Sequence, residues 1–314
     1  MANQLFRRQW KVVVDAGTGT ALDVSNLDVE FKILRTLKSE PNRCTLSLWN
    51  LNKEHRAQLL KRNRPNPTSS RTVGIRVQVD AGYVGNTSTL FLGDLREMSS
   101  VRDATDWKTT LAGDDGGRAY RESRVNKTFT KGTPLSTVLK QCVEALNLGS
   151  GNADKFLADA QVPALGGSLP HTMTLSGNAA QQLSRLLNSM GLTWSIQNGV
   201  VQVAKHNQPL DLAAVLLTPD TGLIGSPEAG IDASVSIGNA QASANSLKAA
   251  KKPKAFDARL VKVKSMLIPG LFPGRRVHLK SDSFDGDYVL TECEYLGQSW
   301  GQDWYVQSIA RQFT

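Results

Sequence analysis

The sequence has no long apolar run. A membrane-spanning helix requires about 18–20 uninterrupted apolar residues, and no stretch of the chain approaches that length. The first ten residues (MANQLFRRQW) also lack the apolar core of a signal peptide. We therefore expect no membrane span, and we expect the protein to be made in a cytoplasm.

Cysteine is scarce, and its spacing favours no metal site. Cys44, Cys142 and Cys293 are far apart, form no CxxC pair and have no nearby histidine at metal-ligand spacing. We expect all three to be buried or half-buried thiols.

A recognisable catalytic motif is also missing. No histidine stands beside a Ser, Cys or carboxylate in a known nucleophile motif. The four histidines are His55, His171, His206 and His278. We expect ordinary surface or half-buried histidines, no catalytic residue and no enzyme activity. Paired carboxylates for glycan hydrolysis stay open, because their separation is a property of the fold.

Two glycine-containing segments lack the rest of a ligand motif. Ala16–Thr20 (AGTGT) follows a strand-like run, but no GxGxxG motif and no helix follows it, so we expect a hairpin turn. Asp114-Asp115 precedes Gly116-Gly117 without the alternating oxygen ligands of a calcium loop, so we expect a turn there too. The sequence therefore predicts no cofactor and no metal.

Aromatic residues make up 6% of the chain, which is little for a surface that stacks nucleic-acid bases. Trp107, Trp194 and Trp304 lie in strand-like runs, where aromatic side chains cover core or barrel surface.

The net charge of +9 is compatible with nucleic acid, an anionic surface or an acidic protein partner. Basic residues are spread along the chain, with one denser run from Lys248 to Lys264, which favours a solvated basic surface.

The length of 314 residues exceeds the roughly 250–300 at which single cores stop growing, so we expect two or more domains. Between residues 10 and 115 apolar residues alternate, which predicts half-buried strands. These are Leu27–Ile33, Cys44–Trp49, Val73–Val79, Thr89–Leu92 and, after a turn at Asp103–Asp106, Trp107–Ala112. One short helix is expected from the N-cap Asn52 to a stop at Pro65. Residues 1–116 are thus predicted to form a β-barrel or sandwich.

The pattern changes after Gly117. Pro134–Leu148 has helical spacing, with Thr133 as cap and Gly149 as stop. A second helix is expected from Ser176 to Met190. The turn Asn198-Gly199, between two apolar runs, predicts a hairpin. Residues 117–205 are therefore predicted to form a small α+β domain.

Alternation returns from residue 206 to residue 314 and predicts a second β domain. Its one interruption is Ala229–Lys254, which is poor in large apolar residues and is expected to be a flexible loop. The expected fold is mainly β, with an α+β insertion between two β domains.

A weak internal repeat connects the two β regions. Gly74–Val79 (GIRVQV) aligns with Gly274–Leu279 (GRRVHL), and Trp107 with Trp304. Each copy also carries a Gly-Asp pair, Gly93-Asp94 and Gly286-Asp287. The repeat predicts two copies of one β module. Chance similarity stays the alternative, because turns reuse the same few residues.

Several segments, taken in order, resemble the phage baseplate hub proteins, the central hubs of contractile tails that are related to the hub portion of type VI secretion spikes. Leu48–Asn52 (LWNLN), Val79–Gly85 (VDAGYVG) and Leu90–Asp94 (LFLGD) are similar to the first barrel of that family. Leu217–Pro227 resembles the segment that enters the second barrel of that family. The family's closing strands are similar to three later segments of this chain: Pro273-Gly274, Gly286–Val289 and Gly297–Trp304.

The resemblance implies two tail-tube-like β-barrel domains and a homotrimeric ring in the tail baseplate of the virion. Such a ring joins the sixfold tail tube to the threefold spike and lets DNA pass. The implied partners are the tube, spike and tape-measure proteins, with DNA only in transit. We expect the surplus positive charge to face outward or toward acidic partners, because phosphate contacts in the channel would slow transit. The alternatives are a basic nucleic-acid-binding protein and a tail-associated cell-wall hydrolase.

Overall fold

The computed structural model describes residues 5, 7–15, 21–63, 75–158, 167–229 and 260–313. Three sequence predictions lie wholly or largely outside this part: the turn at Ala16–Thr20, the loop after Ala229 and the basic run up to residue 259. The described chain divides into two compact units. Unit 1 comprises Met1–Thr36, Arg43–Gly113 and Asn207–Thr314, and unit 2 comprises Leu37–Asn42 and Asp114–His206.

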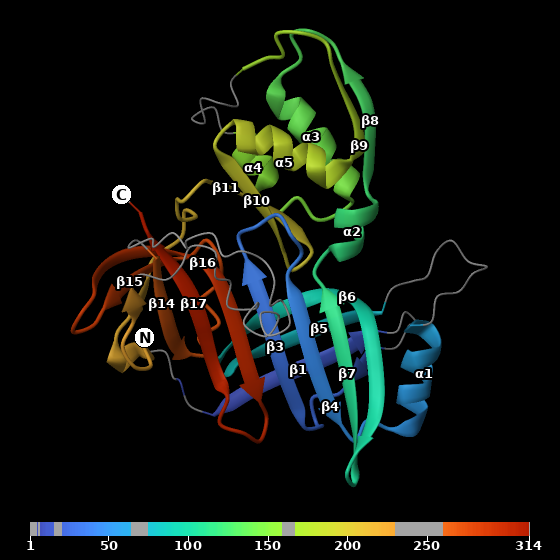
Figure 1. The fold of residues 1–314 in the computed structure, drawn as a ribbon, viewed down its shortest axis with the longest axis vertical. Coiled ribbons are helices and arrows are strands. Elements are labelled where there is room, and N and C mark those ends of the chain that lie inside the picture. The colour runs from blue at the N-terminus through green and yellow to red at the C-terminus, as the bar shows by residue number, and fades with distance from the viewer. Residues whose placement is uncertain are drawn as a thin grey trace, which may run out of the picture. The chain divides into compact units, whose positions relative to one another are not determined.

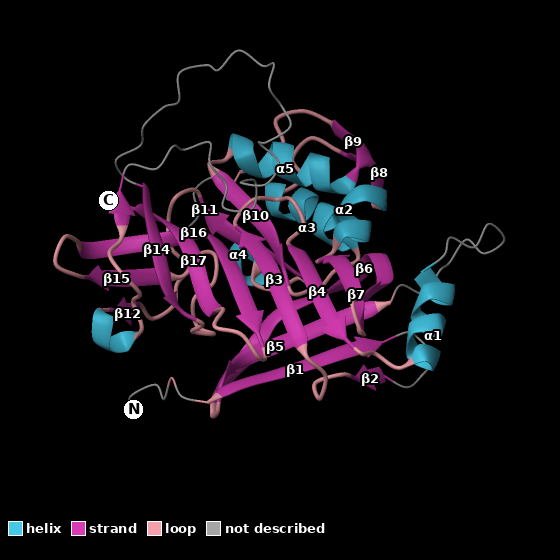
Figure 2. Cartoon of the chain, turned by 60° about the horizontal axis from the view of Figure 1, so that its bottom comes forward, coloured by secondary structure: helices cyan, strands magenta, loops and turns pink. Residues whose placement is uncertain are grey.

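Unit 1 is built mainly from strands, whereas helices gather in unit 2 (Figures 1 and 2). The strands of the first β region are β1 (Arg8–Asp15), β2 (Ala21–Asp23), β3 (Val29–Thr36), β4 (Arg43–Trp49), β5 (Arg76–Tyr83), β6 (Asn86–Asp103) and β7 (Asp106–Asp114). The second β region contains β12 (Val215–Leu217), β13 (Glu228–Ala229), β14 (Leu260–Met266), β15 (Arg276–Lys280), β16 (Asp285–Gln298) and β17 (Trp304–Gln312). The mainly β fold predicted from alternation is confirmed.

One helix, α1 (Lys53–Asn63), lies between β4 and β5. It begins where the sequence predicts, because the Asn52 side chain accepts a hydrogen bond from the backbone N–H of Glu54 at 2.8 Å. Leu59 of α1 is buried in the core. The helix therefore covers part of the core, and it contacts β6.

All thirteen described strands of unit 1 belong to one sheet. Its order is β13-β14-β17-β16-β3-β4-β7-β6-β5-β1-β2, and β15 pairs with both β16 and β12. Most buried apolar residues of unit 1 likewise form one contiguous cluster that draws on both β regions, for example Val14, Phe91, Tyr295 and Val306. A closed barrel is not detected among the described residues, so the two-barrel arrangement stays a prediction.

The same strand order occurs twice in this sheet. In the first region the order is β3-β4-β7-β6-β5-β1, and in the second it is β13-β14-β17-β16-β15-β12. Numbering each set of six along the chain gives the order 2-3-6-5-4-1 in both. One pair differs, since β1 and β5 are antiparallel whereas β12 and β15 are parallel. Strand order is a property of the backbone pairing and is independent of the sequence repeat, so it supports a duplicated module.

The register corrects one part of the sequence repeat. Arg76 pairs with Asp94, and its aligned residue Arg276 pairs with Val289. Gly93-Asp94 therefore corresponds to Tyr288-Val289 and not to Gly286-Asp287. The two Gly-Asp pairs lie two positions apart in the sheet, so their likeness comes from composition and not from equivalent places.

Unit 2 has its own core and its own small sheets. Its elements are α2 (Gly117–Glu122), β8 (Arg124–Phe129), α3 (Leu135–Leu146), α4 (Ala153–Ala158), β9 (Met173–Asn178), α5 (Ala179–Ser189), β10 (Leu192–Gln197) and β11 (Val200–Lys205). β8 pairs with β9, and β10 with β11. The buried residues of α3 and α5 pack with Trp194 in one cluster.

The sequence predicts these helices with errors at their ends. The cap of α3 is Pro134 and not Thr133, and Asn147 ends the helix in the left-handed region at φ 53°, two residues before Gly149. The predicted start of α5 is wrong because residues 176–178 extend β9, where Ser176 pairs with Asn126. The side chain of Asn178 instead accepts a hydrogen bond from Gln181 N–H and caps α5.

Candidate assembly surface

The long strand β16 joins the two β regions of unit 1. On one side it pairs with β17 over nearly its whole length. On the other side Asp285–Val289 pair with β15, and Glu292–Gln298 pair with β3 of the first region. A register shift lies between Leu290 and Glu292, where the strand passes from one neighbour to the other. We call the pairing of β3 with Glu292–Gln298 the internal junction.

Polar side chains fix the register of the internal junction. The Lys32 ammonium lies 3.0 Å from the Glu294 carboxylate, whose side chain is 5% exposed. Gln298 donates a hydrogen bond to Glu30 at 3.1 Å. Beyond the strand, the Ser299 hydroxyl accepts a hydrogen bond from the Val29 backbone N–H at 2.9 Å. A slip of one residue would separate every one of these pairs.

An aromatic cluster covers the end of the internal junction. The ring of Trp304 lies 5.6 Å from Phe31 and 6.1 Å from Trp10, both edge to face, and the Arg8 guanidinium lies 5.5 Å from its centroid. Phe31 reaches Trp304 across Gly297, where an added Cβ would stand 2.2 Å from the phenyl ring. Glycine is therefore required at this position of β16.

Ionisable groups are buried at the centre of the internal junction. Arg35 and Cys293 pair across it, and both are buried together with Glu292. Burial raises the pKa of Cys293 to about 12, and it also raises the pKa of Tyr295, whose hydroxyl donates to the Leu271 carbonyl at 2.5 Å. Both groups stay protonated at neutral pH, so they serve packing and hydrogen bonding.

The cysteine prediction is confirmed throughout. All three thiols are free and buried. Burial raises the pKa of Cys44 strongly and that of Cys142 to about 11. Since the thiolate is the reactive form, these groups are not arranged as nucleophiles.

Three of the histidines lie in separate places: His55 on α1, His171 shortly before β9 and His206 after β11. Among the described residues no group of three or more His, Cys, Asp or Glu has the arrangement of a metal site.

The carboxylates of Asp114 and Asp115 bind neighbouring groups of unit 2. Asp115 accepts hydrogen bonds from the backbone N–H groups of Asn198 and Gly199, at 2.5 and 2.7 Å, which holds the predicted β10–β11 turn.

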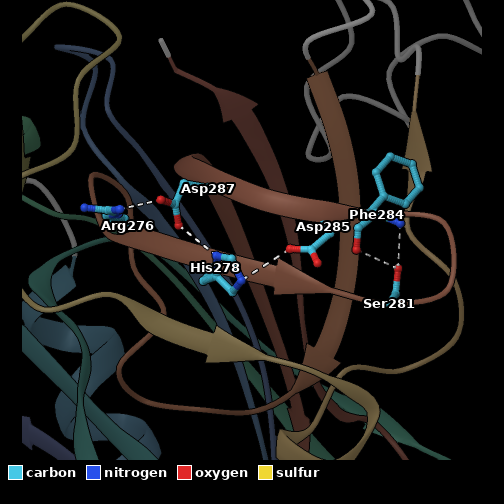
Figure 3. A network of polar contacts seen from close by, with 6 residues as sticks. All are labelled: Arg276, His278, Ser281, Phe284, Asp285 and Asp287. Atoms are coloured by element: carbon cyan, nitrogen blue, oxygen red, sulfur yellow. Dashed lines mark hydrogen bonds and ion pairs between the residues drawn. The ribbon is translucent and has the colours of Figure 1, made fainter.

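The fourth histidine belongs to a polar network on the β15–β16 hairpin (Figure 3). His278 Nδ1 lies 3.0 Å from Asp287, its cross-strand partner, and His278 Nε2 lies 3.4 Å from Asp285. Asp287 also pairs with Arg276, and the hydrogen bonds from Arg276 and His278 lower the pKa of its carboxyl. Alternating charges on both strands (Arg-x-His and Asp-x-Asp) could have revealed this network in the sequence.

The three tryptophans named from the sequence have different surroundings. Trp194 is buried in unit 2 and donates a hydrogen bond to Ser184 at 2.9 Å. Trp304 is buried in the internal junction, whereas Trp107, at the start of β7, is 39% exposed. The guanidinium of Arg56 lies over the Trp107 ring, 3.9 Å from its centroid. The structure does not gather these residues into one aromatic platform.

The outer half of β6, defined as Glu97–Asp103, is an exposed part of the sheet. β5 pairs with β6 from Asn86 to Asp94 only, so beyond that point no described strand pairs with this edge. Most of its side chains are exposed, and Val101 reaches 57%. Figure 1 shows β6 curving away from β5 and continuing beside β7. An exposed strand edge favours pairing with another chain.

Comparison with known proteins identifies the class of molecule. The family model for baseplate hub gp41 matches residues 10–243. No match is found among curated proteins. Among the helices of the described residues, none has the length and apolar character that crossing a membrane requires.

Solved structures support the same fold. The 43 kDa tail protein of prophage MuSo2 from Shewanella oneidensis is similar, with a TM-score of 0.60 and 10% identity over 97% of this chain and 98% of that one. A tail protein from Neisseria meningitidis MC58 has a TM-score of 0.56 and 13% identity, covering 97% of each chain.

A third structure is the E. coli c3393 protein, a component of the type VI secretion system with structural similarity to T4 bacteriophage tail proteins gp27 and gp5. Its TM-score is 0.54 at 10% identity, over 98% of this chain and 77% of that one. At these identities the likeness concerns the fold alone. Because the family model spans more than half of its residues, the chain belongs to the baseplate hub gp41 family, and it is a structural protein of the phage tail baseplate.

Proposed function

We propose that three copies of this chain form a ring that adapts the sixfold tail tube to the threefold spike. Each chain contributes two β modules, one from residues 1–116 and one from residues 206–314, and residues 117–205 act as a brace. Three chains then present six similar modules to the tube and a threefold surface to the spike. DNA passes through the ring without being held.

The observation that carries this proposal is the internal junction. It joins two sets of strands with the same order, 2-3-6-5-4-1, side by side through β3 and β16. A side-by-side contact between two modules generates a closed ring when it is repeated with a rotation that closes, about 60° per module for six modules, and an open filament otherwise. The similarity to a type VI secretion component related to gp27 and gp5 supports a spike as the partner.

The proposed role is structural and not enzymatic. The thiols are buried, and the acidic pair Asp114-Asp115 is used in unit 2 to hold a turn and an arginine, with Asp114 3.1 Å from Arg121. We propose further that the chain is made in the host cytoplasm and that the tube and tape-measure proteins are its other neighbours.

Native mass spectrometry of the purified chain tests the ring directly. We expect a trimer, and class averages with threefold symmetry by electron microscopy. A chain that stays monomeric up to high concentration, alone and with its spike, would overturn the proposal.

Two further assays separate the alternative functions. A DNA shift assay should show weak binding that disappears near physiological salt, whereas tight binding would favour a nucleic-acid-binding protein. Incubation with cell-wall suspensions should leave their turbidity unchanged, whereas clearing would favour a hydrolase.

A further inference from the structure

We propose, resting on the ring described above, that the outer half of β6 is the site where a second copy of this chain docks. The second copy presents the edge that carries β13. The two copies pair as β16 and β3 do at the internal junction. Trp107 is then covered by the neighbouring copy, as Trp304 is covered within the chain.

The first step is that β6 and β16 hold equivalent positions. Arg76 pairs with Asp94 in the first region, and Arg276 pairs with Val289 in the second. Beyond these pairs each strand continues for nine residues, since β6 ends at Asp103 and β16 at Gln298. The outer half of β6 therefore corresponds to the part of β16 that forms the internal junction.

A second measure gives the same register. Tyr295 pairs with Val306, two residues after Trp304. In the first region the Ser100 hydroxyl lies 3.1 Å from that of Thr109, two residues after Trp107. Ser100 is thus the counterpart of Tyr295, and both stand six residues beyond the pairs with β5 and β15.

The second step is that, among the described residues, only one of the two equivalent segments, the one in β16, is covered by a neighbouring strand on both edges. At the internal junction β3 pairs with the whole of Glu292–Gln298, and most of these residues are buried. The outer half of β6 has no described strand on that edge, and most of its residues are exposed. Helix α1 contacts β6 but leaves Val101 57% exposed. Within the described ranges, one repeat of the module is therefore covered by a strand on this edge where the other has none.

The tryptophans repeat this contrast. Trp304 is 5% exposed because Trp10, Phe31 and Arg8 of the first region surround it. Its counterpart Trp107 is 39% exposed. Tryptophan is enriched at the centres of interfaces, and an exposed one at the open end of the module marks where a partner packs.

The third step identifies the edge of the second copy. β13 stands in the second region where β3 stands in the first. Ile33 pairs with Cys44, five residues before the end of β4, and Ala229 pairs with Val261, five residues before the end of β14. Ala229 is thus the counterpart of Ile33.

These equivalences predict the register between two copies. Since Ile33 pairs with Tyr295 inside the chain, Ala229 of one copy should lie opposite Ser100 of the next. Opposite residues of antiparallel strands have Cα atoms about 4.5–5.5 Å apart. That separation is within the range that a disulfide spans.

A cysteine pair tests this register. The double variant Ser100→Cys with Ala229→Cys should, after mild oxidation, form covalent dimers and closed covalent trimers on a non-reducing gel. The two single variants are the controls and should form neither, because the native thiols are buried. A reduced double variant that is trimeric by native mass spectrometry but does not cross-link overturns the proposed site and leaves the ring intact. A monomer overturns both.

A charge substitution gives a readout that does not depend on cysteine chemistry. Val101→Lys should raise the dissociation constant of the trimer at least tenfold. Val84→Lys is the matched control, since Val84 is 49% exposed at the tip of the β5–β6 turn, outside the proposed site. Circular dichroism confirms folding of both. Equal effects of the two substitutions would overturn the proposed site.

Discussion

The outer half of β6 and the equivalent half of β16 are the same structural position in two environments. In β16 the segment is buried by β3, carries the glycine that admits Phe31 and ends beside a buried tryptophan. In β6 it is exposed and ends beside an exposed tryptophan. The difference teaches that a duplicated module does not need two identical surfaces. One copy uses the position for folding, and the other keeps it for assembly.

The largest expected effect separates the two tryptophans. Trp304→Ala removes a buried ring and should lower the free energy of unfolding of the isolated chain by about 3–5 kcal/mol. Trp107→Ala, at the more exposed counterpart, should lower it by only about 1–2 kcal/mol, because its ring is 39% exposed and keeps the Arg56 guanidinium over it. Its main effect should be on the trimer. Chemical denaturation of both variants at a concentration below that of assembly measures this difference. Similar losses in the two variants would contradict the comparison.

The next effect concerns glycine in the two strands. Gly297→Ala places a Cβ against Phe31 and should cost about 1–3 kcal/mol, because the ring must move from its place beside Trp304. Arg102→Ala, at the exposed counterpart five residues before Trp107, should be nearly neutral. Thermal unfolding of both variants tests the pair, and a neutral Gly297→Ala would show that the aromatic cluster repacks freely.

A smaller effect is expected from the ion pair of the internal junction. Lys32→Met leaves the Glu294 carboxylate buried without its partner and should cost about 1–2 kcal/mol. Glu294→Gln alone should cost less, because the amide can be buried at a lower price in solvation. A double-mutant cycle gives the coupling between the two, and a coupling of zero would remove the ion pair from the forces that fix the register.

The smallest effect is a pH dependence on the β15–β16 hairpin. Hydrogen bonds from Arg276 and His278 lower the pKa of Asp287 in the folded chain. A lowered folded pKa contributes stability that is present above the unfolded value, near 3.8, and is lost as the pH falls through the folded value. Asp287→Asn should reduce the loss of stability that the chain shows as the pH falls. Unfolding midpoints between pH 5 and pH 2, compared with Asp282→Asn, measure it, and parallel curves would argue against the contribution.

Alternation and turn residues predicted much of the fold. The strands β3 and β4, the start of α1, the β10–β11 turn and the mainly β class all follow from local patterns, because period-two burial and Asn-Gly turns are properties of a few adjacent residues. The end of α3 and the start of α5 were predicted wrongly. Asn147 ends α3 where Gly149 was expected, and Asn178 caps α5 two residues after the expected start at Ser176.

The internal junction could not be predicted in this way. Glu292 and Thr36, which pair in it, are 256 positions apart, and neither carries a local signal for the other. Segment Leu37–Asn42 likewise belongs to unit 2 because Asn42 donates a hydrogen bond to the Ile196 carbonyl at 2.6 Å, far along the chain. The repeat detected in the sequence pointed to the correct strands, but its Gly-Asp anchor was two residues out of register.

The distance between the two partners of the internal junction also sets the order of events during translation. β3 leaves the ribosome early, yet its neighbour β16 is complete only after residue 298 has been synthesised. Until then one edge of the nascent first region stays without its pairing strand. A chain released before that point therefore lacks the strand that joins its two β regions.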